Sequence, residues 1–178
     1  TITSRNDATA RIDIQVGLGC APLLLGDPKD ITDDFAADTI NGATADWTID
    51  TGTGLTVSGG IVSVSDTTTR RLRHTATGYV ETDVQATIRI DTGSAVANLD
   101  DTVMICADTA GADTHLGARL AGSGVGTSPN TLAVVKRVAG SLTVLASTAF
   151  TPATATTYWL RVRRQGDDVT AEVFTQTL

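Results

Sequence analysis

The sequence predicts an all-β protein with two packed antiparallel sheets, and three observations lead to this fold class. The 178 residues include 32 Thr and 16 Val, which favour pleated strands, but only two Glu and two Lys, which usually cover helix surfaces. The chain also has 18 Asp and 17 Gly, residues typical of turns. About ten apolar or alternating segments follow one another at short spacing, as in sandwiches and barrels.

The first 32 residues differ in pattern from the rest of the chain. Residues 11–16 alternate polar and apolar side chains, which predicts a strand with one buried face. Residues 17–26 are apolar and irregular, and a turn signal comes next at residues 27–30. Because this stretch is too short to bury a core of its own, we expect an N-terminal arm over residues 1–32. It would pack on the main domain or on another protein, and residues 33–178 would form the sandwich.

The next segments are short strands separated by glycine-rich turns. Residues 55–57 and 62–64 flank Gly59-Gly60, and glycines supply the positive backbone angles of a tight hairpin. Residues 70–76 form a polar strand. Residues 80–90 alternate most regularly, which predicts a strand with one face in the core and one in water.

The second half of the chain continues with strands and hairpins. Residues 102–107 form an almost continuous apolar run, which predicts a strand covered on both faces. In residues 157–164, the alternation points Tyr158 and Leu160 to one side. Trp159, Arg161 and Arg163 then point to the other side. The further expected strands are residues 115–120, 132–138, 142–146 and 169–176. Long strands with one polar face favour two sheets in a jelly-roll arrangement.

Charge and hydropathy exclude several classes of partner. The formal net charge of −7 argues against a nucleic-acid binder and against a protein that binds anionic membranes, since both need a basic surface. No stretch approaches the roughly 18 apolar residues that span a bilayer, so we expect no membrane insertion. Cys20 and Cys106 lie in apolar surroundings, which predicts buried free thiols, with a single disulfide as the alternative.

Three motifs resemble the concanavalin A-like lectin/glucanase domains. Asp33-Asp34-Phe35, then Trp47, then the hairpin of residues 55–63 resemble the opening of that family. Residues 80–90 resemble its long central strand, and residues 157–171 its late hairpin. The resemblance covers residues 33–176 and implies a jelly-roll sandwich.

Residues 10–32 are similar to the N-terminal arms of minor tail proteins from phages of actinobacterial hosts. The excess of Arg over Lys and of Asp over Glu also fits a GC-rich genome. Together the two resemblances imply a phage virion protein, located in the tail, whose arm anchors it to other virion proteins. They also imply a homo-oligomer. An extracellular location is the alternative.

The sequence predicts that the chain is not an enzyme. Glycosidases of this sandwich family place Glu, Asp and Glu along one strand, so that two carboxyl groups flank the sugar bond. Here Glu81 and Asp83 are followed by Gln85, so the set is incomplete. His74 and His115 lie in no metal-ligand spacing, and no Gly-x-Ser-x-Gly elbow occurs.

Calcium is the one cofactor that the resemblance suggests, because many concanavalin A-like domains bind it through Asp side chains and carbonyl oxygens. Asp33 and Asp34 are the first candidate ligands. Further candidates are Asp38, Asp100, Asp101, Asp167 and Asp168. The alternative is that these residues serve as turn formers, which Asp does throughout this chain.

Trp159, Arg161 and Arg163 are the candidate ligand-binding residues, because an exposed aromatic ring beside basic groups can hold a sugar. The alternative is that Trp159 packs under the second sheet or a neighbouring subunit. We therefore expect a non-catalytic virion structural and interaction protein that contacts subunits or the host surface, with a host-surface glycan as one partner. The alternative is a carbohydrate-binding module of a secreted or cell-surface protein.

Overall fold

The computed structural model describes residues 10–15, 35, 40, 47–52, 55–64, 70–74, 83–93, 96–105 and 114–175. The chain divides into two compact units. The sandwich unit comprises Thr1–Pro22 and Glu81–Leu178, and the small unit comprises Leu23–Val80. The expected arm boundary after residue 32 lies outside the described residues and stays a prediction.

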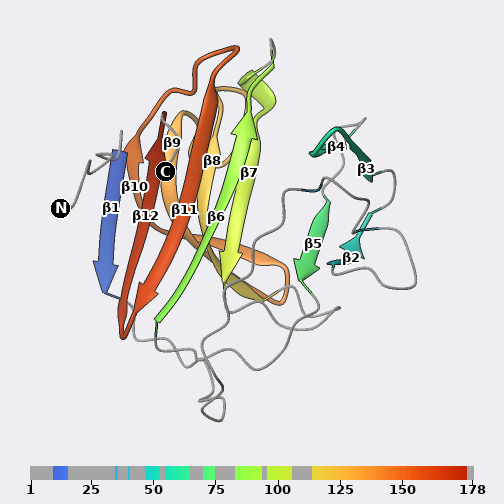
Figure 1. The fold of residues 1–178 in the computed structure, drawn as a ribbon. Helices are drawn as coiled ribbons and strands as arrows, with labels where there is room; N and C mark the ends of the chain where they lie inside the picture. Colours follow the sequence, from blue (N-terminus) through green and yellow to red (C-terminus); the bar gives the residue numbers. More distant parts are fainter. Residues whose placement is uncertain are drawn as a thin grey trace, which may run out of the picture. The chain divides into compact units, whose positions relative to one another are not determined.

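The first sheet of the sandwich unit has four antiparallel strands (Figure 1). In spatial order they are β1 (Ala10–Gln15), β12 (Asp168–Phe174), β11 (Thr157–Gln165) and β6 (Asp83–Asp91). The N-terminal strand β1 thus pairs with the last described strand of its own chain, Ala10 opposite Val173 and Gln15 opposite Asp168. This sheet therefore joins residues from the two ends of the sequence.

The second sheet also has four antiparallel strands. In spatial order they are β10 (Ser141–Ala149), β9 (Thr131–Val138), β8 (His115–Ala121) and β7 (Asp100–Ile105). A single turn of 3-10 helix, Val96–Asn98, precedes β7 and is the one helical element among the described residues. The prediction of an all-β protein is confirmed.

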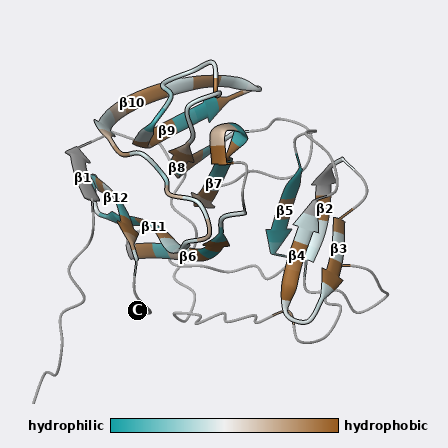
Figure 2. Ribbon diagram, turned by 90° about the horizontal axis from the view of Figure 1, so that it is seen from above, coloured by the Kyte–Doolittle hydropathy of each residue, from teal (hydrophilic) through white to brown (hydrophobic). Residues whose placement is uncertain are grey.

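The two sheets lie face to face and share one hydrophobic core (Figure 2). The first sheet contributes alternate residues of β6, β11 and β12, and the second contributes alternate residues of β7, β8 and β9. Burying one such Leu or Val side chain stabilises the fold by about 1.5–3 kcal/mol. The buried members of this core are Ile90, Val103, Ile105, Leu116, Ala118, Leu120, Leu132, Val134, Tyr158, Leu160, Val162, Val169, Ala171 and Val173.

The alternation predicted for β11 is confirmed, and one prediction for β7 is wrong. Leu160 and Val162 are 0% exposed in the core, while Arg163 is exposed on the opposite face. The apolar run at residues 102–107 was expected to be covered on both faces. In β7, however, Val103 is buried and Met104 only partly, because one face of β7 packs in the core and the other is incompletely covered. Residues 106 and 107 lie outside the described residues.

Three hairpins depend on backbone angles that glycine adopts easily. Gly59 and Gly60 have φ of 58° and 76° between β3 (Leu55–Ser58) and β4 (Ile61–Val64) of the small unit. Gly166, with φ of 59°, begins the β11–β12 turn. The β9–β10 turn has Ala139 at φ 47° before Gly140 at φ 82°, so one of its two left-handed positions holds a non-glycine residue.

The small unit contains two two-stranded sheets, β3–β4 and β2 (Trp47–Thr51) with β5 (Arg71–His74). The Trp47 ring lies 5.7 Å from the Phe35 ring and 5.0 Å from the His74 ring, the latter edge-on. Ile40 and Leu55 are buried. Trp47 thus packs in an aromatic cluster of the small unit.

Across the described ranges, none of the helical structure is long and apolar enough to span a membrane.

Replacing Ala139 by Gly is expected to raise the free energy of unfolding by about 0.5 kcal/mol. Gly relieves the left-handed strain, about 1 kcal/mol or more, and this outweighs the greater freedom of the unfolded chain. Urea unfolding checks it. The matched control is Ala149→Gly at the exposed end of β10, where φ is not positive and the change should destabilise. Equal destabilisation by both changes would contradict the assigned turn.

Candidate functional site

The predicted binding residues lie on the outer face of the first sheet, defined here as the side chains of β6, β11 and β12 that point away from the core. Cross-strand partners share a face, so the register places each β11 residue between two neighbours. Trp159 lies between Arg89 and Phe174, Arg161 between Thr87 and Glu172, and Arg163 between Gln85 and Thr170. The structure thus brings Trp159, Arg161 and Arg163 to one face, as the alternation predicts.

Arg161 forms an ion pair with a neighbouring residue on this face. Its Nε donates to Glu172 Oε2 at 2.7 Å, and its guanidinium carbon lies 4.6 Å from the centre of the Phe174 ring. Glu172 is only 6% exposed, and a buried carboxylate needs a charged or hydrogen-bonding partner. Arg161 therefore covers Phe174 and neutralises Glu172, so its positive charge is largely balanced within the chain.

Of the three candidate binding residues, Arg163 and Trp159 remain available. Arg163 is exposed, and within the described part of the chain it makes no hydrogen bond or ion pair. The Trp159 side chain is half-buried. The two residues are four positions apart on one strand, which separates them by about 13 Å.

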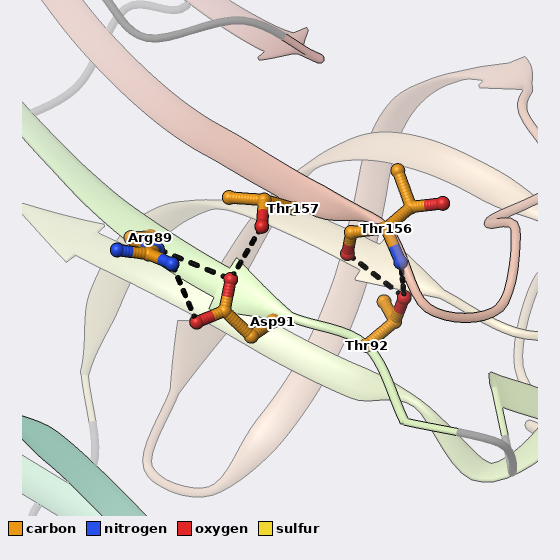
Figure 3. Close-up of polar contacts among 5 residues, drawn as sticks. All are labelled: Arg89, Asp91, Thr92, Thr156 and Thr157. Carbon is orange, nitrogen blue, oxygen red and sulfur yellow. Dashed lines mark hydrogen bonds and ion pairs between the residues drawn. The ribbon is translucent and has the colours of Figure 1, made fainter.

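A polar cluster continues the outer face at the end of β6 (Figure 3). Arg89 Nε donates to Asp91 Oδ1 at 3.1 Å, and Thr157 Oγ1 donates to the same oxygen at 2.7 Å. The Thr157 hydrogen bond, followed by Arg89, lowers the pKa of Asp91 below its usual value. Asp91 is therefore ionised at neutral pH and unsuited to act as a proton donor.

The beginning of β11 is held by a buried threonine next to this cluster. Thr92 Oγ1 accepts from the Thr156 N–H at 2.9 Å and donates to the Ala153 carbonyl at 2.8 Å (Figure 3 shows the contact with Thr156). Tyr158 adds a second link, since its hydroxyl accepts from the Ala153 N–H at 2.8 Å. These bonds fix the segment that presents Thr157 and Trp159.

The second sheet holds a charge pair that sequence reasoning missed. Arg119 in β8 is 3% exposed and binds Asp100 of β7 through two hydrogen bonds of 2.6 and 3.0 Å. A third bond of 2.8 Å reaches the Thr127 carbonyl. The only local signal was an arginine in a mainly apolar strand. This pairing occupies Asp100, one of the candidate calcium ligands.

The remaining metal and catalytic candidates are scattered. Asp33, Asp34, Asp38 and Glu81 lie outside the described residues, as do Cys20 and Cys106. Among the residues that are described, no three His, Cys, Asp or Glu side chains lie close enough to hold a metal ion together. The calcium site therefore stays a prediction.

The two histidines lie in different settings. His74 belongs to β5 of the small unit and meets the edge of the Trp47 ring. His115 begins β8 and is 7% exposed. Each histidine thus belongs to the packing of its own unit.

Comparison with protein-family models, with curated proteins and with solved structures gave no match for this chain.

Asp101→Asn is expected to stabilise the protein at pH 7. Burial, followed by the neighbouring Asp100 carboxylate, raises the pKa of Asp101 above its usual value. Asp101 lies opposite the core residue Leu120, so ionising it opposes folding. Because the folded pKa is the higher one, this penalty is present at neutral pH. It disappears as the pH falls through the raised pKa toward the unfolded value of about 3.9.

Denaturant unfolding at pH 7, 5.5 and 4 measures this effect. The advantage of Asp101→Asn should be present at pH 7 and smaller at pH 4, with the value at pH 5.5 locating the decrease. Asp167→Asn, in the exposed β11–β12 turn, is the control that makes the same chemical change away from the core. An Asp101→Asn variant no more stable than the parent at pH 7 would overturn the assignment.

Proposed function

We propose that this chain is a non-catalytic structural and interaction protein of a phage tail. In this proposal a concanavalin A-like jelly-roll sandwich contacts neighbouring subunits or the host surface. The observation that carries it is the outer face of the first sheet. There the carboxylates of Asp91 and Glu172 are paired with arginines, while Trp159 and Arg163 face outward. Carboxylates held in ion pairs suit a rigid recognition surface better than proton transfer.

The tail assignment is supported by the sequence of residues 10–32, which is similar to the N-terminal arms of minor tail proteins. Residues 10–15 of that segment form β1 and pair with β12 of the same chain. We therefore place the anchoring contacts with other virion proteins on exposed surfaces of the sandwich rather than on this strand.

Mass spectrometry of purified virions tests the tail assignment. Virions of the phage that encodes this chain should contain it at a stoichiometry of several copies, and antibodies against it should label the tail in electron micrographs. Virions that infect normally and lack the chain would exclude this function. Labelling confined to the capsid would exclude the tail location.

The second candidate function is a carbohydrate-binding module of a secreted or cell-surface protein. The pairing of β1 with β12 favours it, because the N-terminal strand then completes its own domain, as a free-standing module requires. Trp159 offers an indole face for a sugar ring, and Arg163 offers donors for hydroxyl or carboxylate oxygens. Calcium would be a cofactor of such a module.

A glycan array with the parent protein and three variants tests this candidate. Trp159→Ala and Arg163→Ala should each weaken binding about tenfold, the expected loss for one charged hydrogen bond or one stacked ring. Lys136→Ala is the matched control, since it also removes one positive charge but lies on β9 of the second sheet. A chelator should weaken binding if calcium takes part. A well-folded parent protein that binds no glycan would exclude the module.

A further inference from the structure

The four edge strands of the sandwich unit differ in charge. The edges are β1 and β6 in the first sheet and β10 and β7 in the second. Charged residues on an edge strand discourage pairing with another chain. Three of the edges each carry at least two charged residues. These are Arg11 and Asp13 in β1, Asp83, Arg89 and Asp91 in β6, and Asp100 and Asp101 in β7. The nine residues of β10, SLTVLASTA, include none.

Among the described residues, no strand pairs with the outward edge of β10. Its ladder is formed with β9 alone, and no other backbone hydrogen bond of Ser141–Ala149 is found in the described part of the chain. No residue of β10 is buried, in contrast to the neighbouring β9. β1 of the facing sheet lies near β10 (Figure 2), but the ladder of β1 is formed with β12 and that of β10 with β9.

We propose that β10 is the contact through which a second copy of this chain binds, antiparallel and edge to edge. The net charge of −7 opposes contact between most surfaces of two copies. Of the four edges, β10 is the one without a charged residue, so two copies can pair there without removing a charged side chain from water. Pairing identical strands antiparallel generates a two-fold axis, the commonest symmetry of protein oligomers.

A β-bulge sets the position of that axis. The register of β10 with β9 shifts between Val144 and Ala146. A bulge interrupts a straight ladder, so each copy offers two short straight runs on either side of Leu145. With the axis at Leu145, the run Ser141–Val144 of one copy pairs with Ala146–Ala149 of the other. Thr143 then lies opposite Ser147 of the second copy.

Dimerisation through β10 depends neither on the tail assignment nor on glycan binding. The edge belongs to the second sheet, whereas the proposed recognition surface lies on the first. A self-associating edge is compatible with a tail subunit and with a free-standing module. A chain that does not dimerise would leave either function untouched.

Sedimentation equilibrium over a range of protein concentrations tests the proposal. The parent chain should change reversibly from monomer to dimer as its concentration rises. Thr143→Lys/Ser147→Lys places a lysine opposite a lysine twice in the dimer. It should weaken the dimer about tenfold or more. Thr151→Lys/Thr154→Lys adds the same charge at exposed loop positions, and should dimerise like the parent.

A mixing experiment makes the test independent of any loss of stability. Thr143→Glu/Ser147→Glu should also be monomeric alone, but should form a mixed dimer with the double-lysine variant. A parent chain that stays monomeric at every concentration overturns the proposal. A double-lysine variant that dimerises like the parent also overturns it. If either variant fails to unfold cooperatively, the mixing experiment is replaced by hydrogen exchange on the parent chain, which measures the protection of the β10 amides. In the parent that protection should rise with concentration, and a constant value counts against the dimer.

Discussion

The packing of two sheets around one core is the constraint on which the rest of the structure depends. Each central strand must direct every second side chain into the core, and in β11 these are Tyr158, Leu160 and Val162. A shift of one residue in the register would bury Trp159 and Arg161 instead. The apolar residues of β11 therefore decide which of its side chains are available for recognition.

The outer face of the first sheet follows from this register. Because Arg161 lies opposite Glu172, a carboxylate that is almost fully buried gains its ion pair, and the guanidinium also covers Phe174. Removing Arg161 would leave that carboxylate without one of its partners, so its role in stability is separate from any role in binding. In the described structure, neither Trp159 nor Arg163 neutralises a buried charged group. In the proposed function, recognition by this sheet would therefore depend mainly on these two residues.

The sequence predicted local features well and pairings poorly. The alternation of β11, the Gly59-Gly60 hairpin and the all-β fold class could all be predicted, because each depends on residues close together in the chain. The Arg119–Asp100 pair could not, since nothing local shows which strands become neighbours. The burial of residues 102–105 was overestimated because an apolar run does not show whether the second face of its strand will be covered. No local pattern marked the limits of the small unit, because Leu23–Val80 and the sandwich unit both contain short strands joined by turns.

Nuclear Overhauser contacts of two adjacent residues, Leu160 and Trp159, test the central claim most directly. The claim is that the two sheets share a core and that β11 turns Trp159 away from it. The methyl groups of Leu160 should then show contacts with methyl groups of the second sheet, such as those of Leu120 and Val134. The indole protons of Trp159 should show contacts with Arg89 and Phe174 and none with these methyl groups. Indole contacts with Leu120 or Val134 would contradict the register and, with it, the proposed recognition surface.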